Sequence, residues 1–338
     1  MPLIQLEPHL FSSLPAHPSL PSNPDRPQLQ TFIRDALAET FDVLCAIPSN
    51  FTMDPKLRDS PPCSVPVTLY RGNFEPRKSS KPDFWVCRET EHRDWAARGT
   101  ASFDEFEHGL RSNHAEHEME YTPSITGLER LLEWSKSEIG EVELDGVTFK
   151  DVGAEGESWE FLHNTWTMMP LLTTADDSVN LITHTFKPAF LISPRSFISL
   201  SISAQYENFA PRTAAQQTEN PANVSFVTAQ IPLRSTPSDA LHEKIMAAVP
   251  RKTIFANYAS VERVTLLPPS PFGSGTHRRV RWTMATTSNA GGLIPQWVQR
   301  SWTLGGVPRA IAADVGLFIG WVMKRRNEER TPEDFPED

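Results

Sequence analysis

The sequence contains few cysteines, no excess of basic residues and no long apolar run. The three cysteines, Cys45, Cys63 and Cys87, are an odd number without close spacing, which favours reduced thiols over a disulfide framework. Lysines and arginines number 32 against 42 aspartates and glutamates, so the net charge is −10 and we expect no nucleic-acid partner. The longest apolar run covers only residues 315–323, whereas a membrane-spanning helix needs about 20 residues. We therefore predict no transmembrane segment.

Motifs that mark common enzyme and cofactor sites are also absent. The sequence has no Gly-x-Ser-x-Gly elbow for a nucleophilic serine, no phosphate-binding loop and no dinucleotide fingerprint. The N-terminal residues lack the basic region and the unbroken apolar segment of a signal peptide, which predicts a cytoplasmic protein. These absences favour a non-enzymatic protein that needs no cofactor.

The residue present in excess is proline. The chain has 30 prolines, nearly twice the usual share of about 5%. They cluster in residues 1–27 and 48–82, which we predict to be loops or extended arms. We divide the chain into a Pro-rich N-terminal arm (residues 1–27), a single domain (residues 28–326, with its core at about 60–325) and a disordered, charged tail (residues 327–338).

Two helices are predicted in the N-terminal half. Apolar residues recur at helical spacing over residues 28–46, which indicates an amphipathic helix. Ser102 is followed three residues later by Glu105, and this capping box predicts the start of a second helix. That helix runs to Tyr121, because Pro123 ends it.

A third helix, predicted at residues 307–322, is apolar on almost every side, although Asp314 interrupts its apolar surface. Such a helix is either buried in protein or inserted in a membrane. The apolar run is too short to cross a bilayer, so we predict that the helix is buried.

Strands are predicted between these helices. Residues 196–206 alternate strictly, which is typical of an antiparallel strand with a buried face. We predict that Ile198, Leu200 and Ile202 on that face pack against the C-terminal helix. Runs of strands between helices indicate an α+β fold, here a curved sheet wrapped around the C-terminal helix with a central cavity. Further strand patterns occur at residues 65–70, 83–92, 159–168, 179–186, 224–231, 254–267 and 279–284.

Three segments resemble START-type lipid-transfer domains, which have the helix-grip fold. These segments are Phe186 to Phe197 with its Ser-Pro-Arg-Ser-Phe ending, residues 227–232 with the strand 258–264, and residues 292–297 before the C-terminal helix. Ser196 stands where those domains usually have aspartate, a departure that would remove an ion pair with Arg195. The resemblance implies a hydrophobic ligand cavity, and it does not establish catalysis.

The chain resembles more closely a fungal START-like family of unassigned function. The segments that carry this likeness are Trp85-Val-Cys-Arg88 and residues 113–121, with the sequence Asn-His-Ala-Glu-His-Glu-Met-Glu-Tyr. The two resemblances together cover roughly residues 60–325.

Polar side chains take over the apolar face of the helix predicted at residues 102–121. His117 and Tyr121 continue a stripe that begins with Phe103, Phe106 and Leu110. They are either residues at the edge of the core or part of a mostly apolar ligand site with a few polar groups.

A metal site on the same helix is an alternative. His108, His114 and His117, with Glu116 and Glu118 nearby, have side chains that can bind zinc. The spacing does not match the His-Glu-x-x-His pattern, so we predict no metal site.

Arg88 and His92 lie on one face of a predicted strand, together with apolar neighbours. A buried arginine needs a partner, and Glu262 is the carboxylate that we consider, either for a structural ion pair or beside a ligand's polar end. Trp282 and Met284 are predicted to form a wall of the cavity or part of the core.

The sequence thus predicts a carrier or sensor for a lipid or another hydrophobic small molecule, with transient membrane contact. The predicted ligand-binding residues are Arg88, His92, His117, Tyr121, Arg195, Tyr258, Glu262, Trp282 and Met284. The alternative is an enzyme that acts on a polyketide- or terpenoid-like substrate, with acid–base catalysis by His117, Tyr121 or His92.

Overall fold

The structure is a computed structural model of the whole chain. It describes residues 2–75, 82–152, 156–157, 172–173, 176–184, 193–207, 223–269, 277–292, 294–301 and 306–329. The strand predicted at residues 159–168 and most of the predicted tail lie outside the described residues. Residues 327–329, which we assigned to the tail, belong instead to the last helix.

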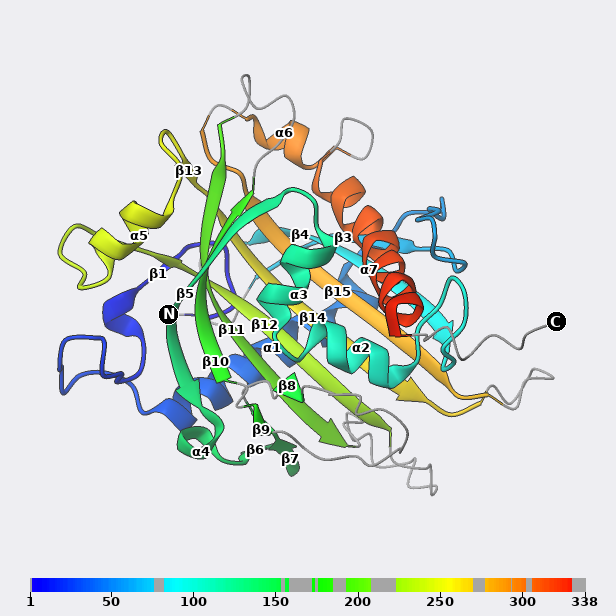
Figure 1. Cartoon of the computed structure of the whole chain (residues 1–338), viewed down its shortest axis with the longest axis horizontal. Coiled ribbons are helices and arrows are strands. Elements are labelled where there is room, and N and C mark those ends of the chain that lie inside the picture. Colours follow the sequence, from blue (N-terminus) through cyan, green and yellow to red (C-terminus); the bar gives the residue numbers. More distant parts are fainter. Residues whose placement is uncertain are drawn as a thin grey trace.

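A large, curved antiparallel sheet forms the centre of the molecule (Figure 1). Its strands follow the order β2 (Thr52–Met53), β3 (Thr68–Phe74), β4 (Asp83–Arg93), β15 (Arg279–Asn289), β14 (Asn257–Leu267), β12 (Val224–Arg234), β11 (Arg195–Glu207), β10 (Asp176–His184) and β5 (Ile125–Ser135). Shorter strands attached to it are β1 (His9–Leu10), β6 (Val142–Leu144), β7 (Val147–Lys150) and β13 (Ile254–Phe255). A separate pair consists of β8 (Gly156–Glu157) and β9 (Leu172–Thr173).

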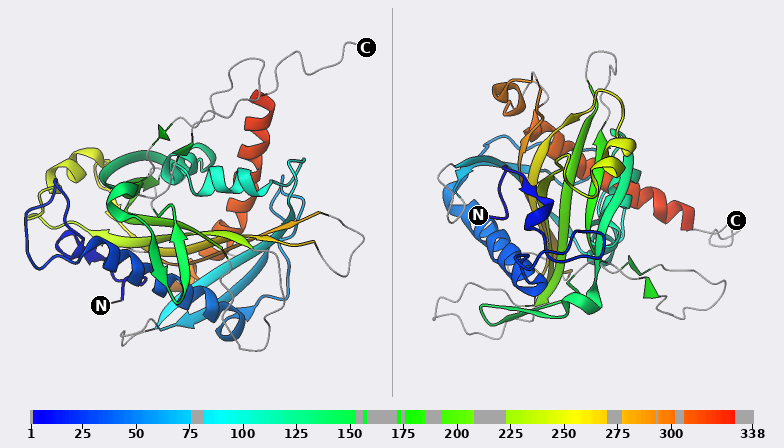
Figure 2. Two further views of the ribbon diagram at one scale, coloured as in Figure 1. Left: turned by 90° about the horizontal axis from the view of Figure 1, so that it is seen from below. Right: turned by 90° about the vertical axis from the view of Figure 1, so that its left-hand side faces the viewer.

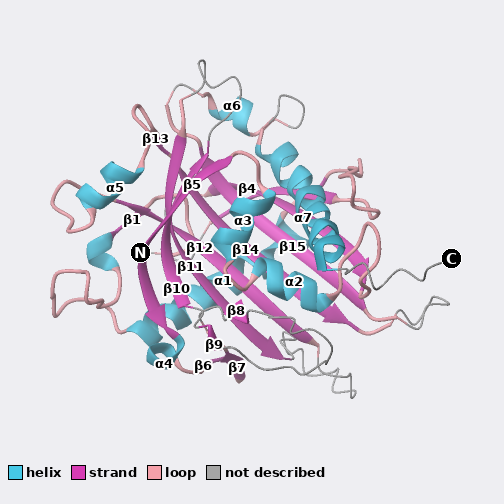
Figure 3. Cartoon of the chain, viewed as in Figure 1, coloured by secondary structure: helices cyan, strands magenta, loops and turns pink. Residues whose placement is uncertain are grey.

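Helices cover both faces of this sheet (Figures 2 and 3). They are α1 (Leu29–Asn50), α2 (Phe103–Leu110), α3 (His114–Tyr121), α4 (Lys136–Ile139), α5 (His242–Ala248), α6 (Gln296–Gln299) and α7 (Val307–Glu329), with a 3-10 turn at Phe11–Ser13. Helix α1 lies on one face, and α2, α3 and α7 lie on the other. The predicted α+β, helix-grip arrangement is therefore confirmed. Among the helices described, none is both long and apolar enough to cross a membrane.

Helix α7 packs on the sheet through one aromatic core. Phe318 lies with its ring centroid 5.2 Å from those of Phe106 and Trp282. Another side of α7 lies close to the backbone at Pro61. This contact requires glycine at position 316, because an added Cβ would lie 2.5 Å from the carbonyl oxygen of Pro61. This helix is buried on several sides, as its sequence predicted.

The apolar face of β11 does not face α7. Ile198, Leu200 and Ile202 are buried in the core that also contains Phe41 and Leu37 of α1, so our prediction for this face is wrong. The physical reason is that helices cover both faces of the sheet. Alternation shows which side chains are buried together, but it does not show which helix buries them.

The N-terminal arm packs on the α1 side of the sheet. Its residues Ile4, Phe11 and Leu14 are buried in the same core as α1. The Glu39 carboxylate accepts hydrogen bonds from the backbone N–H groups of Leu3 (2.6 Å) and Ile4 (2.8 Å). Strand β1 also pairs in parallel with the end of β12. A domain boundary at residue 28 stays a prediction.

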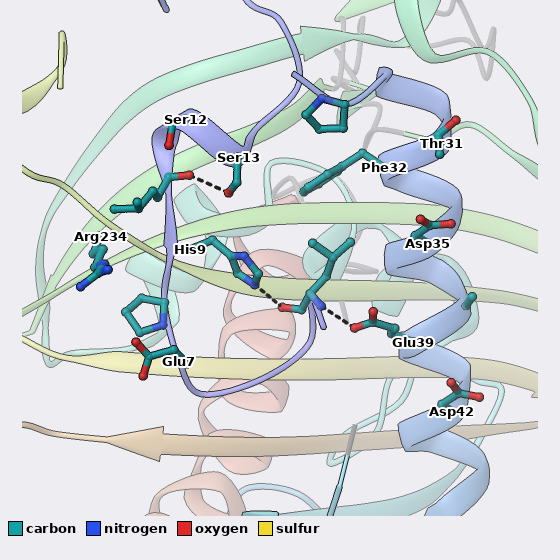
Figure 4. A pocket seen from close by; sticks show the side chains of 15 residues that line it. Glu7, His9, Ser12, Ser13, Thr31, Phe32, Asp35, Glu39, Asp42 and Arg234 are labelled. Atoms are coloured by element: carbon teal, nitrogen blue, oxygen red, sulfur yellow. Dashed lines mark hydrogen bonds between the residues drawn. The ribbon is translucent and has the colours of Figure 1, made fainter. Parts of the chain in front are cut away.

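An open pocket of about 600 Å³ lies between the arm, α1 and the end of β12 (Figure 4). Asp35 and Asp42 line it from α1, and Glu7, His9 and Arg234 line it from the opposite side (Figure 4). His9 is placed by a contact of its ring nitrogen with the carbonyl oxygen of Leu3 (3.3 Å). The pocket therefore owes its shape to the docking of the arm.

Candidate functional site

An enclosed cavity lies on the other face of the sheet, beneath α3 and α7. Its volume is about 70 Å³. The lining side chains are Arg88, His114, Glu118, Tyr121, Thr122, Thr228, Gln230, Tyr258, Ser260, Glu262, Trp282, Met284 and Asp314. Ionisable, hydroxyl and aromatic groups dominate this lining, whereas the sequence led us to expect a hydrophobic cavity.

Six of the predicted site residues come together here, and three do not. The six are Arg88, Tyr121, Tyr258, Glu262, Trp282 and Met284. His92, His117 and Arg195 are not among the lining residues. The ligand-binding role of all nine stays a prediction.

The floor of the cavity is a row of side chains across four neighbouring strands. Arg88 of β4 is paired with Met284 of β15, which is paired with Glu262 of β14, which is paired with Thr228 of β12. Directly paired residues of antiparallel strands point to the same face. Trp282 is two residues from Met284 and so lies on this face as well.

Arg88 is buried at one end of this row, with a side chain that is 3% exposed. Its Nη2 donates to Glu262 Oε1 at 3.3 Å, and its guanidinium carbon lies 3.7 Å from the centroid of the Trp282 ring. Trp282 Nε1 donates to the same Glu262 oxygen at 2.7 Å. The ion pair that we considered for Arg88 and Glu262 is present. Arg88 Nε and Nη1 are buried without a hydrogen-bond partner in the described part of the chain.

Two further carboxyl groups reach the cavity from the helices above it, Glu118 from α3 and Asp314 from α7. The Glu118 side chain lines the cavity and is 25% exposed. Burial, with Glu118 and Glu262 nearby, raises the pKa of Asp314 to about 7, although Arg88 opposes the shift. Burial also raises the pKa of Glu118, against the effect of His114.

Substitution Asp314→Asn is expected to stabilise the protein at pH 8 by on the order of 1–3 kcal/mol, because one pKa unit corresponds to about 1.36 kcal/mol. The pKa of Asp314 rises from 3.8 to about 7 on folding, so the folded state favours the protonated acid. The stability that the protonated Asp314 contributes is complete below pH 3.8 and is lost as the pH rises through about 7. Urea unfolding at pH 4.5 and pH 8 measures the difference. An equal gain at both pH values would contradict a raised pKa, and Glu328→Gln on the exposed end of α7 is the control.

His117 lies outside the cavity because the predicted helix of residues 102–121 is broken. The capping box at Ser102 starts α2 as predicted, but α2 ends at Leu110, and Asn113 adopts a left-handed conformation (φ 44°) before α3. His117 fits the first of the two interpretations of this stripe, a residue at the edge of the core, whereas Tyr121 lines the cavity.

His117 instead packs at the outer edge of α2, α3 and α7. Its ring centroid lies 4.9 Å from that of His108 and 5.0 Å from that of Trp321. Arg325 Nη1 lies 3.2 Å from His108 Nε2 and 3.4 Å from His117 Nε2. Burial, with the nearby His108 and Arg325, lowers the pKa of His117 to about 4. In the part of the chain that is described, no three His, Cys, Asp or Glu side chains are arranged to hold a metal ion.

His92 shares the strand face of Arg88 but lies farther along β4, beneath α2. Its ring nitrogens contact the hydroxyl groups of Thr100 (3.1 Å) and Thr90 (3.0 Å), and its ring stands edge-on to Phe106. Burial lowers the pKa of His92 to about 4, assisted by Arg88. The side chain is thus satisfied within the core.

Arg195 lies at the beginning of β11 and ties two loops together. Its guanidinium donates to the carbonyl oxygens of Ala290 (3.3 Å) and Ser193. Ser196, which replaces the aspartate of the START pattern, makes hydroxyl contacts with Thr183 and Thr253, both at 2.9 Å. Arg195 and Ser196 therefore bond to carbonyl and hydroxyl groups, and not to each other as an ion pair.

Comparison with known proteins adds a family and two distant structural likenesses. None of the curated proteins matches the chain. The crystal structure of human STARD10 aligns at 10% identity with a TM-score of 0.43, over 93% of this chain and 85% of that one. The human StAR-related lipid transfer protein 5 also aligns at 10% identity and a TM-score of 0.43, over 88% of this chain and 98% of that one. Likenesses this weak carry no argument about function. The family model described as "Protein of unknown function (DUF3074)" matches residues 85–322, which is more than half of the chain, and the chain belongs to that family.

Proposed function

We propose that the protein binds a lipid or another hydrophobic small molecule as a carrier or sensor, with the ligand's polar end in the cavity beneath α3 and α7. The observation that supports this most directly is the set of buried polar atoms without partners around one enclosed space. These atoms are Arg88 Nε and Nη1, His114 Nδ1, Glu118 Oε2 and Thr228 Oγ1. Leaving such an atom unpaired costs about 1–3 kcal/mol, so a ligand group that pairs with several of them binds favourably.

The size of the cavity limits what enters it as the structure stands. A volume of about 70 Å³ holds a small polar group, whereas sites for whole drug-sized ligands measure about 300–1,000 Å³. Binding of an apolar body thus requires α3 and α7 to separate. Helix α3 is suited to such a movement, because it has only eight residues and follows the break at Asn113. In this proposal the protein works in the cytoplasm and contacts membranes only transiently.

The carrier function is better supported than acid–base catalysis. Of the three side chains predicted to transfer protons, His92 and His117 lie outside the cavity, and only Tyr121 lines it. Burial raises the pKa of Tyr121, with the nearby carboxylates adding to the effect, so its phenol does not act as a base near neutral pH. A catalytic site needs at least two groups within reach of one reacting atom.

The test is native mass spectrometry of the protein as purified from its host. We expect a bound hydrophobic small molecule on the wild-type protein at a stoichiometry of one. Thr228→Leu is expected to reduce its occupancy severalfold, because the larger apolar side chain fills part of the cavity and removes a free hydroxyl. Thr68→Leu on β3, which is not among the lining residues, is the matched control. Equal occupancy in the wild-type protein and Thr228→Leu would show that the ligand sits elsewhere.

A further inference from the structure

The charges that line the cavity do not balance. Three carboxyl groups, those of Glu118, Glu262 and Asp314, share it with one guanidinium group, that of Arg88. His114 adds a second positive charge only when it is protonated. In either state of His114, three ionised carboxylates exceed the cations by at least one charge.

The single guanidinium is already engaged on one side of the cavity. Arg88 donates a hydrogen bond to the Glu262 carboxylate, and its guanidinium group covers the ring of Trp282. Breaking a buried pair of this kind costs about 3–5 kcal/mol. Arg88 is therefore held beside Glu262, and it acts on Asp314 only at a distance, where its charge opposes the rise in the pKa of that group.

Glu118 and Asp314 have no cation within hydrogen-bonding distance among the side chains that the structure describes. The basic group nearest to Glu118 among the described side chains is His114, whose Nε2 lies 3.8 Å from Glu118 Oε2, beyond the usual hydrogen-bond limit of about 3.2 Å. Glu118 Oε2 is buried without a hydrogen-bond partner. The raised pKa of each group shows the cost of ionising it in this place.

The wall beside these carboxylates is aromatic. Tyr121 and Tyr258 both line the cavity, and burial raises the pKa of each phenol, so both rings stay uncharged at neutral pH. The face of an aromatic ring attracts a cation by about 0.5–2 kcal/mol, most strongly where water is excluded. Carboxylates and ring faces together favour a positively charged nitrogen.

We propose, building on the function proposed above, that the polar end of the ligand is an ammonium group that lies between Glu118 and Asp314. One such group cancels one unit of the excess negative charge and donates hydrogen bonds to both carboxylates. An oxygen atom next to the nitrogen accepts from the free Nη1 of Arg88. The ligand class is therefore a long-chain amine with an oxygen atom beside the nitrogen, and we expect an anionic fatty acid to bind less tightly.

Protons compete with this ligand for Asp314, so binding depends on pH. The ionisable groups that line the cavity around Asp314 are Arg88 of β4, Glu262 and Tyr258 of β14, and His114, Glu118 and Tyr121 of α3. A cation needs the ionised carboxylate. Its affinity is therefore expected to fall by up to about tenfold in all as the pH drops from 8 to 6, because the pKa of Asp314 is about 7.

The experiment is isothermal titration of the purified full-length protein with decylamine, decanol and decanoate at pH 8 and pH 6. At pH 8 we expect one site that binds decylamine at least about tenfold more tightly than decanol, which corresponds to about 1.4 kcal/mol. Asp314→Asn and Glu118→Gln are each expected to remove most of this preference, because each variant leaves one carboxylate fewer for the ammonium group. Asp314→Asn is also expected to weaken the pH dependence.

Glu328→Gln is the control for attraction between a cation and an acidic protein. It removes one charge from the exposed end of α7, where Glu328 pairs with Lys324, so decylamine binding should not change. Tightest binding of decanoate would overturn the ammonium site in favour of an anion on Arg88, while the binding function would stand. The same decylamine affinity in Asp314→Asn and Glu118→Gln as in the wild-type protein would also overturn the site. If none of the three probes binds, the proposed function fails together with it.

Discussion

Replacement of Arg88 by methionine is expected to lower the free energy of unfolding by about 3–5 kcal/mol, the usual cost of removing one partner of a buried ion pair. The two side chains of the pair are only 3% and 9% exposed. The substitution leaves Glu262 buried, with the hydrogen bond from Trp282 Nε1 still in place. Urea denaturation at pH 7, followed by circular dichroism, measures the loss.

Two controls separate the buried charge from the loss of a long side chain. The double variant Arg88→Met/Glu262→Gln is expected to regain most of the lost stability, because no unpaired charge remains in it. Arg279→Met on the neighbouring strand removes a partly exposed arginine that pairs with Glu91, and it should cost less than about 1 kcal/mol. Equal losses for Arg88→Met and the double variant would mean that packing, and not charge, holds this row together.

Replacement of Ile311 by alanine is expected to cost about 2–5 kcal/mol, as for other large-to-small changes in a packed core. Ile311 is 3% exposed and belongs to the core between α7 and the sheet, together with Val315 and Phe318. The same denaturation experiment measures the effect. Ile311→Val removes one methylene group and should cost about 0.5–1.5 kcal/mol. A loss below about 1 kcal/mol for the alanine variant would mean that Ile311 borders empty space instead of packed side chains.

The sequence predicts the architecture because several local patterns agree. The capping box at Ser102, the alternation of β11 and the apolar surface of α7 each identify an element that the structure contains. What they do not specify is the layer in which an element packs. Ile198, Leu200 and Ile202 would show the same alternation beneath either α1 or α7. The assignment to α7 failed for that reason.

Five strand residues of the cavity were predicted, but of its described helical residues only Tyr121 was. Arg88 and Glu262 stand out because a charge on an apolar strand face needs a partner, and side chains alternate reliably along a strand. On the helices, the sequence did not predict the break at Asn113 between α2 and α3. His117 was chosen on the stripe of α2, whereas His114 and Glu118 of α3 line the cavity.

The signal for Asp314 was present in the sequence and was used only to delimit an apolar run. No aspartate or glutamate occurs from residue 263 to residue 313, so this acid ends a long acid-free stretch within a helix that is apolar on almost every side. An isolated carboxylate in such a helix either meets a partner or changes its pKa. That reasoning identifies Asp314 as a candidate without a structure.

The parallel pairing of β1 with β12 has a consequence for the order of events on the ribosome. Residues His9 and Leu10 leave the ribosome first, yet they pair with Leu233 and Arg234. At about 5–20 residues per second, translation of the intervening chain takes on the order of tens of seconds. During that interval the apolar side chains of the arm and α1 lack the strands that later cover them, and they are exposed to chaperones and to aggregation. Changes in the arm are therefore expected to affect the yield of folded protein before they affect anything on the opposite face of the sheet.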